Sequence, residues 1–241
     1  MYDLVPQNDL IAKVEVIHSH EQHCPVILLL DTSGSMSFPN ESPQINQLNK
    51  ALEEFKKEIE KDDLAKKRID LAIVTFGCND IQISQNFTTI DHFTPVKYKA
   101  GGATPMGNAI YTAIELVENR KKHYQEEGTD YFRPWIFLIT DGAPTDMEEG
   151  SAKWYEIINK VHNGEKNKKF SFYAIGVDNA DMSKLNKISP PTRTALKLKE
   201  SKWLEMFHWL SRSLVATSTP ENYQEGQQPL ESPLGWGYAQ R

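Results

Sequence analysis

Three short segments of the sequence bring carboxylate and hydroxyl side chains together at close spacing. The segments are Asp31-Thr32-Ser33-Gly34-Ser35, Gly101-Gly102-Ala103-Thr104-Pro105 and Thr140-Asp141-Gly142. Their candidate metal ligands are the carboxylates and hydroxyls of Asp31, Ser33, Ser35, Thr104 and Asp141. All five are hard oxygen donors, and a set without imidazole or thiolate suits Mg²⁺ or Mn²⁺ better than Zn²⁺. The expected chemistry is therefore the binding of a divalent cation, provided that the fold brings the segments to one place.

Each segment also has an ordinary structural explanation. The pattern Asp-x-Ser-Gly occurs in turns and at helix starts, Thr104 before Pro105 is a suitable helix N-cap, and Asp-Gly is a common turn. Any one segment alone therefore favours the ordinary explanation. The three together favour the metal site, because each stands at the end of an expected strand or the start of an expected helix.

The elements around these segments alternate between strands and helices. The apolar runs Val26–Leu30 and Trp135–Ile139 each end close to a candidate aspartate, and both are typical of strands buried on two faces. Further buried strands are predicted at Ile69–Phe76 and Phe170–Val177. A half-exposed strand is predicted at Ile81–Phe87, joined to Ile69–Phe76 by a hairpin through residues 78–80. In such a sheet, ligands bind beyond the carboxyl ends of the parallel strands, which is where the three segments are expected to meet.

Amphipathic helices are expected between the strands. Their apolar positions recur at steps of three and four residues over Ile45–Ile59, Pro105–Glu127, Glu148–His162 and Trp203–Leu214. The predicted fold class is therefore α/β, with a Rossmann-like, open, doubly wound and mostly parallel sheet, one antiparallel edge strand and helices on both faces.

Length and composition divide the chain into one domain and two ends. With 241 residues, at roughly 150 residues per domain, we expect one sizeable domain over residues 22–218. Residues 1–21 are expected to be an N-terminal extension in which Leu10–Ile17 adds a possible edge strand. Residues 219–241 are rich in Pro, Gly, Gln, Ser and Glu and are expected to be a disordered tail, in which Trp236-Gly237-Tyr238 is either a docking peptide or an unstructured end.

Net charge indicates which classes of partner to expect, and the apolar pattern and the first residues indicate the cellular compartment. A formal net charge of −6 argues against nucleic acid or an anionic membrane as the main partner. The longest apolar run, Pro25–Leu30, is far shorter than the roughly 20 residues of a membrane-spanning helix. Residues 1–10 lack a basic and apolar leader, so a cytoplasmic location is expected. Cys24 and Cys78 are expected to be free thiols at opposite ends of parallel strands.

The five candidate ligands resemble the metal-ion-dependent adhesion site of von Willebrand factor A domains. The pattern Asp31-x-Ser33-x-Ser35, Thr104 in a glycine-rich loop and Asp141-Gly142 matches that site at five of five positions. The resemblance implies that the hydroxyls bind the ion directly, while Asp31 and Asp141 act mainly through bound water or hydrogen bonds. It also implies a non-catalytic domain that binds a protein partner. Neutral hydroxyl ligands leave the charge of the ion incompletely neutralised, so an open coordination position attracts an outside carboxylate.

A narrower resemblance is to bacterial TerY-like proteins of tellurite-resistance and stress operons. It is carried by the stretches Pro25–Met36, Arg133–Asp146 and Pro190–Ser218, the last including Pro191-Thr192-Arg193 and Phe207-His208-Trp209-Leu210-Ser211. Members of that family are associated with a protein kinase and a PP2C-type phosphatase. The resemblance therefore implies a partner of that kind and a role in a bacterial stress response.

Three other interpretations are consistent with parts of the sequence: a metal-dependent phosphohydrolase, a structural subunit whose metal only braces loops, and a zinc site. A metal-dependent phosphohydrolase also holds Mg²⁺ with aspartates at strand ends, but no Lys or Arg lies in residues 31–37, 101–108 or 140–150 to bind a transferring phosphoryl group. A Zn²⁺ site at His18, His20, His23 and Cys24 lacks the second ligand pair of common structural zinc sites, so solvated residues before a strand are favoured there. We therefore expect a metal-dependent binding domain and no enzyme.

Overall fold

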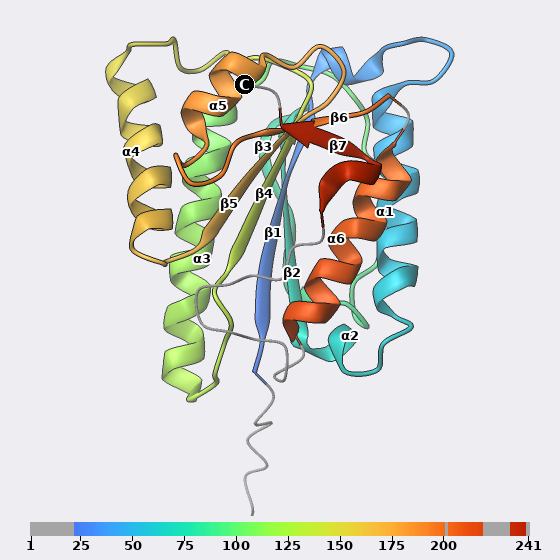
Figure 1. Cartoon of the computed structure of the whole chain (residues 1–241), viewed down its shortest axis with the longest axis vertical. Helices are drawn as coiled ribbons and strands as arrows, with labels where there is room; N and C mark the ends of the chain where they lie inside the picture. Colours follow the sequence, from blue (N-terminus) through green and yellow to red (C-terminus); the bar gives the residue numbers. More distant parts are fainter. Residues whose placement is uncertain (1–21, 201, 219–231, 240–241) are drawn as a thin grey trace, which may run out of the picture.

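A computed structural model describes residues 22–200, 202–218 and 232–239 of the chain. Its centre is a seven-stranded sheet with the strand order β3-β2-β1-β4-β5-β6-β7 (Figure 1). The strands are β1 (Cys24–Thr32), β2 (Ile69–Gly77), β3 (Asp80–Thr89), β4 (Trp135–Thr140), β5 (Ser171–Gly176), β6 (Leu196–Leu198) and β7 (Gly237–Ala239). In this order the neighbours β2, β1, β4, β5 and β6 run parallel, and β3 pairs antiparallel with β2. The predicted fold class is confirmed.

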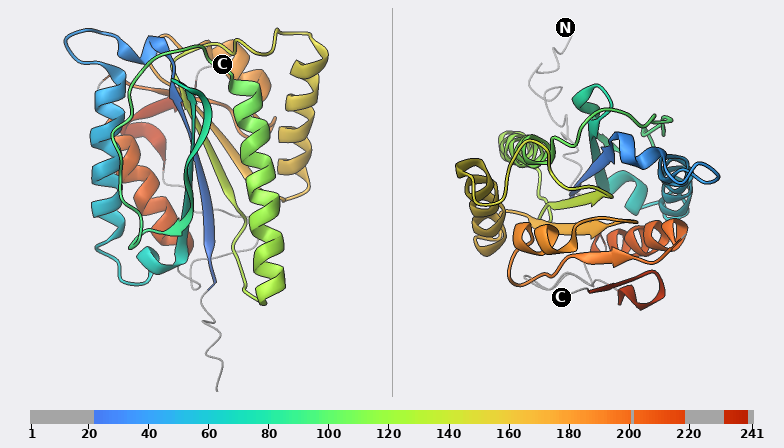
Figure 2. Two further views of the ribbon diagram at one scale, coloured as in Figure 1. Left: turned by 180° about the vertical axis from the view of Figure 1, so that it is seen from behind. Right: turned by 90° about the horizontal axis from the view of Figure 1, so that it is seen from above.

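Helices cover both faces of this sheet, as the alternating pattern predicts. They are α1 (Gln44–Ile59), α2 (Ala65–Arg68), α3 (Met106–Glu127), α4 (Ala152–Lys166), α5 (Met182–Ile188) and α6 (Trp203–Ser218), with single 3₁₀ turns at Gly34–Ser37 and Pro233–Gly235. The view from above shows α1 and α6 on one side and α3 and α4 on the other (Figure 2). Because both faces are covered, the nine residues of β1 are all buried, which explains its unbroken apolar run.

The two faces of β1 belong to two separate parts of the core. Val26 and Leu28 pack in the same apolar cluster as α1 and α6. Ile27 and Leu29 pack in the cluster that α3, α4 and α5 share. Successive side chains of a strand point to opposite faces, so this alternation anchors β1 between both helix layers. The loop that leaves its carboxyl end is therefore firmly positioned.

The fourth predicted helix begins later than the sequence pattern indicated. We predicted a helix from Glu148, but α4 begins at Ala152. Gly150 has a positive φ of 86°, a left-handed conformation that a helix cannot contain. The side chain of Ser151 then accepts a hydrogen bond from the backbone N–H of Trp154 and caps the first turn.

The C-terminal segment differs from its prediction where the structure describes it. Residues 232–239 were expected to be part of a disordered tail, but they form a 3₁₀ turn and β7, which pairs antiparallel with β6. Trp236 is only 2% exposed and its ring centroid lies 4.9 Å from that of Trp209. The prediction is therefore wrong for these residues, because Trp236 finds an apolar site on the domain itself. Residues 219–231 lie outside the described part of the chain.

Three further expectations concern the N-terminal residues, the two cysteines and a membrane-spanning helix. The possible edge strand Leu10–Ile17 falls among residues that the structure does not describe. Cys24 begins β1 and Cys78 follows β2, so the two free thiols lie at opposite ends of the parallel strands as predicted. No helix among the described residues is long and apolar enough to cross a membrane.

Candidate metal centre

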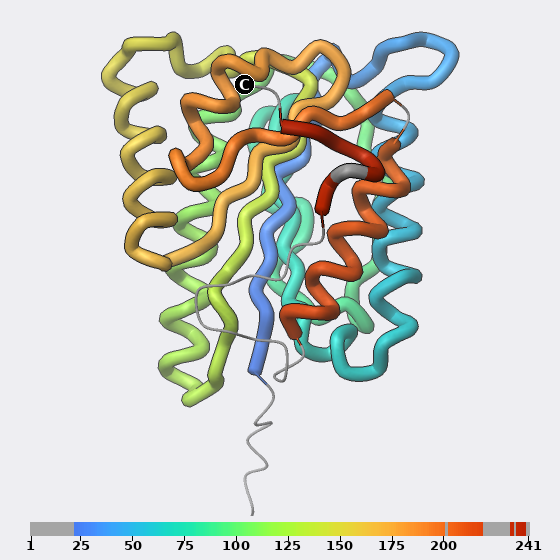
Figure 3. The backbone as a smooth tube through the Cα atoms, in the orientation of Figure 1, coloured from blue at the N-terminus to red at the C-terminus, as the bar shows by residue number. Residues whose placement is uncertain are grey.

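The candidate ligands gather at the carboxyl edge of the parallel strands. Asp31 lies near the end of β1, and Ser33 and Ser35 follow in the loop and 3₁₀ turn after it. Asp141 comes directly after β4, and Thr104 stands two residues before α3. The backbone trace shows the loops after β1, β4 and β5 at the same upper end of the sheet (Figure 3). The register explains this, because β1 and β4 are parallel neighbours with Leu30 opposite Ile139.

Asp31 is completely buried and is held from both sides. Its Oδ1 accepts a hydrogen bond of 2.8 Å from the backbone N–H of Ser33. Its Oδ2 accepts a hydrogen bond of 2.5 Å from the hydroxyl of Thr140, the last residue of β4. Thr140 in turn accepts a hydrogen bond from the backbone N–H of Gly142. Asp31 therefore joins the loops that follow β1 and β4, and sequence reasoning had assigned no such role to Thr140.

The two serines connect the first loop to Asp141. The hydroxyls of Ser33 and Ser35 lie 3.0 Å apart, within hydrogen-bond distance. The hydroxyl of Ser35 donates a hydrogen bond of 2.7 Å to Oδ1 of Asp141. Four of the five predicted ligands therefore form one continuous polar cluster.

Thr104 reaches the same cluster through the space next to Gly142. A Cβ atom placed on Gly142 would lie 3.4 Å from the hydroxyl oxygen of Thr104 and 3.8 Å from Oδ2 of Asp31. Gly142 therefore lies between these two side chains. The ordinary explanation of Thr104 as a helix cap does not apply, because α3 has no side-chain cap and the Thr104 hydroxyl forms no hydrogen bond with the described residues.

Two residues after the Asp141 loop fix the position of Thr104. Its backbone N–H donates to the hydroxyl of Thr145, and its carbonyl accepts from the backbone N–H of Thr145. The carboxylate of Asp146 accepts hydrogen bonds from the backbone N–H groups of Gly107 and Asn108 in the first turn of α3. Asp146 also forms an ion pair with Lys153. Asp146 therefore holds the start of α3 from a distant loop, a role that its position in the sequence did not indicate.

Two glycines let the surrounding loops approach closely. Gly77 has a φ of 132°, and a Cβ atom on it would come within 2.3 Å of the backbone nitrogen of Ser33. Gly102 has a φ of 75°, and its Cβ atom would come within 2.3 Å of the carbonyl oxygen of Gly77. A larger residue at either position meets both a steric and a conformational barrier. The glycines thus allow the β1, β2 and Gly101–Gly102 backbones to pack side by side at the site.

The electrostatics of the cluster favour a cation. Burial raises the pKa of Asp31 above its ordinary value, although hydrogen bonds from Ser33 and Thr140 oppose the shift. Burial also raises the pKa of Asp141 to about 6, against the hydrogen bond from Ser35, and the negative charges of Asp31 and Asp178 add to the effect. Among the described residues, no basic side chain forms an ion pair with Asp31 or Asp141. Two buried carboxylates without a cationic partner are costly, and a divalent cation would offset that cost.

The donor chemistry therefore fits a hard divalent cation. The cluster offers two carboxylates and three hydroxyls, one of which, on Thr104, forms no hydrogen bond with the described residues. No group of three or more His, Cys, Asp or Glu side chains that could hold a metal occurs in the described part of the chain. Of the alternative zinc ligands, Cys24 is fully buried and His23 faces Asp70, while His18 and His20 lie outside the described residues.

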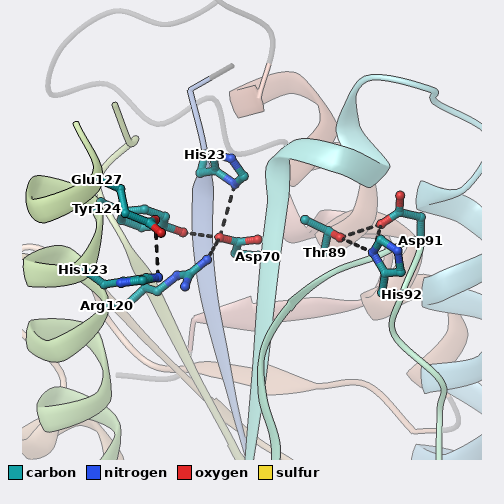
Figure 4. A network of polar contacts seen from close by, with 9 residues as sticks. All are labelled: His23, Asp70, Thr89, Asp91, His92, Arg120, His123, Tyr124 and Glu127. Atoms are coloured by element: carbon teal, nitrogen blue, oxygen red, sulfur yellow. Dashed lines mark hydrogen bonds and ion pairs between the residues drawn. The ribbon is translucent and has the colours of Figure 1, made fainter. Parts of the chain in front are cut away.

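A second polar cluster lies at the opposite end of the sheet (Figure 4). Asp70, near the start of β2, is 1% exposed and forms an ion pair of 2.6 Å with Arg120. The hydroxyl of Tyr124 donates a hydrogen bond to the same carboxylate oxygen, and Nδ1 of His23 lies 3.2 Å from it. Sequence reasoning missed this cluster. A charged residue inside the apolar run Ile69–Phe76 was the available signal, since a carboxylate in a buried strand needs a partner.

Comparison with known proteins agrees with the observed fold. The profile of the von Willebrand factor type A domain family matches residues 26–207 of the chain. The search of curated protein sequences returned no match.

Several solved structures are similar in fold. The pilus adhesin SpaC of Lactobacillus rhamnosus GG has 12% sequence identity and a TM-score of 0.62, over 81% of this chain and 31% of that chain. The vWF domain of the type V pili tip protein Mfa5 of Porphyromonas gingivalis has 10% identity and a TM-score of 0.59, over 85% and 99% of the two chains. The minor pilin PilB of Streptococcus sanguinis has 13% identity and a TM-score of 0.55, over 79% and 61%. This chain thus spans about a third of the length of SpaC, and at such low identity the likeness shows the fold alone.

Proposed function

This chain belongs to the von Willebrand factor type A domain family, and we propose that it captures a protein partner through a divalent-cation site. Members of the family commonly bind other proteins through such a site. The proposed ligands are Asp31, Ser33, Ser35, Thr104 and Asp141, and the proposed cation is Mg²⁺ or Mn²⁺. The observation that carries the proposal is the convergence of three hydroxyls and two buried carboxylates. Among the described residues, no basic side chain forms an ion pair with either carboxylate.

The division of roles among the five residues follows from their contacts. Ser33, Ser35 and Thr104 are proposed to bind the cation directly through neutral oxygen atoms. Asp31 is already engaged by the backbone of Ser33 and by Thr140, so it is suited to orient water or hydroxyl ligands. A bound divalent cation supplies positive charge that these neutral ligands leave largely uncompensated, and a carboxylate of the partner completes it. The proposed partner therefore presents an Asp or Glu residue.

The family is generally composed of interaction modules without catalytic activity, and we propose the same for this chain. The rival proposal is a metal-dependent phosphohydrolase, which needs a cationic group to bind the transferring phosphoryl group. The structure brings Lys153 to Asp146 near the start of α3, but Lys153 is engaged there in an ion pair of 2.8 Å. Protein binding does not need such a cationic group, so the residues of the site fit a binding function better than a phosphohydrolase.

The biological setting is a further part of the proposal. The resemblance of residues 25–36, 133–146 and 190–218 to TerY-like proteins supports a role in a bacterial stress or tellurite-resistance system, with a kinase or a PP2C-type phosphatase as the partner. A cytoplasmic location is proposed together with that role. The identity of the genes beside this one would test the proposed system.

Calorimetric titration of the full chain with Mg²⁺ and with Mn²⁺ tests the metal site. The wild type is expected to bind one ion, and the double variant Ser33→Ala/Asp141→Ala is expected to bind none. Ser37→Ala is the matched control, because the Ser37 hydroxyl belongs to the same turn but donates to the carbonyl of Gly34. Equal heats for the wild type and the double variant would refute the site. Turnover of p-nitrophenyl phosphate that disappears in the double variant would favour the phosphohydrolase.

A further inference from the structure

A pocket of about 230 Å³ lies between three strands and the chain that leads to α3. It is lined by side chains of β1, β2 and β3, by the hairpin residues Cys78 and Asn79, and by the segment Lys97–Lys99. The view from behind shows the chain between β3 and α3 rising past these strands to the upper end of the sheet (Figure 2). The pocket is therefore formed where this chain crosses the first three strands.

The segment that carries the two lysines is held in place from both sides. The side chain of Asn49 of α1 donates a hydrogen bond of 2.9 Å to the carbonyl of Tyr98 and accepts one of 2.8 Å from its backbone N–H. The hydroxyl of Tyr98 lies 2.9 Å from that of Ser84 on β3, within hydrogen-bond distance. Lys97 and Lys99 flank Tyr98, so their backbone positions at the pocket are fixed.

The charge of the pocket is positive. Lys97 and Lys99 both line it and are exposed, and neither forms an ion pair or a hydrogen bond with the described residues. None of the described residues around the pocket is acidic. In a chain with a formal net charge of −6, this pocket therefore concentrates two uncompensated positive charges.

The other grooves of the described chain differ in this respect. The groove between α3 and α4 sets three lysines against three glutamates. The groove beside β6 and β7 sets two lysines against one aspartate and one glutamate. In the small pocket next to Trp209, the basic residue is Arg193, which already pairs with Glu165. The positive charge of the pocket at Lys97 and Lys99 is thus a property of that pocket and not of the surface in general.

Neutral hydrogen-bond donors accompany the two lysines. Burial raises the pKa of Tyr98, against the hydrogen bond with Ser84, so its hydroxyl stays protonated at neutral pH. The Tyr98 and Ser84 hydroxyls carry two hydrogens and use one between them, so the other can be donated to a ligand. The side-chain amides of Asn79 and Gln82 also line the pocket and supply N–H donors. These groups can bind several oxygen atoms of one anion.

We propose that this pocket binds a doubly charged phosphate group, with Lys97 and Lys99 as its cationic ligands. A phosphate monoester carries a charge of about −1.5 to −2 at pH 7 and three acceptor oxygens, which matches two ammonium groups and neutral donors. A single carboxylate carries one charge and would leave one lysine without a partner. None of the five candidate metal ligands is among the described residues that line the pocket. The inference therefore goes beyond the proposed function and does not depend on it.

Alkylation of Cys78 tests the pocket on the full chain, in EDTA and at constant ionic strength. The chain has two cysteines; Cys24 is fully buried, whereas Cys78 is partly exposed and lines the pocket. Bound phosphate would cover the Cys78 thiol, so its reaction with iodoacetamide, followed by mass spectrometry, is expected to slow as inorganic phosphate is added at pH 8. Acetate is the singly charged control and is expected to have little effect. A rate that ignores phosphate, or that falls equally with acetate, would overturn the proposal.

Variants of the two lysines show whether they bind the anion. Lys97→Met and Lys99→Met are each expected to raise the phosphate concentration at half-protection about fivefold, and together about 25-fold. Both lysines are exposed, so the fold should persist. Lys122→Met is the matched control, because it removes the same charge from an exposed position in the groove between α3 and α4. Half-protection of the double variant at the wild-type phosphate concentration would overturn the proposal.

Two short peptides distinguish the sources of the phosphate group. One carries a single phosphoserine between glycines, and the other carries serine in its place. Half-protection at a lower concentration of phosphopeptide than of inorganic phosphate would support the pocket and assign it to a phosphorylated protein segment. Half-protection at an equal or higher concentration would support it as a site for free phosphate. Equal protection by the serine peptide and the phosphopeptide would overturn the proposal, because the phosphate group would then contribute nothing.

Discussion

The hydroxyl of Ser35 donates a hydrogen bond of 2.7 Å to Oδ1 of Asp141, across 106 positions of sequence. This contact joins the loop after β1 to the loop after β4. Because Ser33 lies within 3.0 Å of Ser35 and Asp31 is bound to Thr140, the contact belongs to a cluster that spans both loops. Four of the five candidate ligands are therefore held close together by hydrogen bonds within the protein itself.

The substitution Asp141→Asn tests whether the cluster is arranged for a cation. Asn keeps an oxygen atom for Ser35 but removes one of two buried charges that lack a cationic partner. We expect the variant without metal to be at least as stable as the wild type, and the stabilisation by Mg²⁺ to be lost. At about 100 times the dissociation constant, the wild type should gain about 2.7 kcal/mol, or roughly 5 to 10 °C in melting temperature.

Differential scanning fluorimetry with and without Mg²⁺ measures both effects of Asp141→Asn. Asp63→Asn is the control, since Asp63 is an exposed residue paired with Lys66. A variant that still gains the full wild-type shift with Mg²⁺ would contradict the assignment of Asp141.

The substitution Gly142→Ala tests the space beside Thr104. The added methyl group would lie 3.4 Å from the Thr104 hydroxyl and 3.8 Å from Oδ2 of Asp31, which is ordinary van der Waals contact. We therefore expect the melting temperature without metal to stay within about 2 °C, consistent with a cost below roughly 0.5 kcal/mol. The affinity for Mg²⁺ should fall at least about tenfold, because the methyl group occupies space that the ion and its water need. Unchanged affinity in calorimetry would place the ion elsewhere.

Asp70 is expected to matter for stability and not for metal binding. The Asp70 carboxylate is buried and its ion-pair partner Arg120 is half-buried, so Asp70→Ala would leave Arg120 without its carboxylate partner. Removing one partner of such a pair typically costs about 3 to 5 kcal/mol. Urea unfolding should show a loss of this size, while the affinity for Mg²⁺ should remain that of the wild type. A variant with the stability of the wild type that no longer binds Mg²⁺ would contradict this expectation.

The same cluster predicts a dependence of stability on pH. Burial alone would raise the pKa of Asp70, but the contacts with His23, Tyr124 and Arg120 outweigh it and hold the pKa below its usual value. A carboxyl group with a depressed pKa stabilises the fold above its unfolded pKa of about 3.9, and the contribution is lost as the pH falls through the lower folded pKa. Without metal, the stability difference between the wild type and Asp70→Asn should thus be full at pH 6 and shrink below about pH 4. A difference that is constant from pH 6 to pH 3 would contradict this account.

The sequence predicted the parts of the molecule that repeat a regular pattern. Largely apolar runs identified β1, β2, β4 and β5, because a strand covered on both faces is mostly apolar. The position of Asp31 and Asp141 after such runs then predicted their approach at one edge, because parallel strands end on the same side. The hydrogen bonds that link these loops agree with that expectation, whereas the binding of a metal there stays a prediction.

The contacts that position the site could not be predicted in this way. Asp146 binds the start of α3 from 38 residues away, and the carboxylate of a surface loop gives no sequence signal of such a distant partner. β6 has only three residues, too few for a period to appear. The order of residues 232–239 was missed because the composition of the segment is polar on average, whereas one buried tryptophan and the free edge of β6 determine its local structure.

The last prediction concerns Trp236. Its indole ring packs against Trp209 of α6, and its carbonyl accepts a hydrogen bond of 2.8 Å from the backbone N–H of Lys199. Trp236→Ala would leave a cavity against α6, and removal of a large buried side chain typically costs about 3 to 5 kcal/mol. Deletion of residues 232–241 should cost at least as much, since β6 also loses its antiparallel partner. Chemical unfolding measures both losses, and Tyr238→Ser, which removes a half-exposed ring from the same strand, should cost less than about 1 kcal/mol. If Trp236→Ala unfolded at the same urea concentration as the wild type, residues 232–239 would not be part of the folded domain.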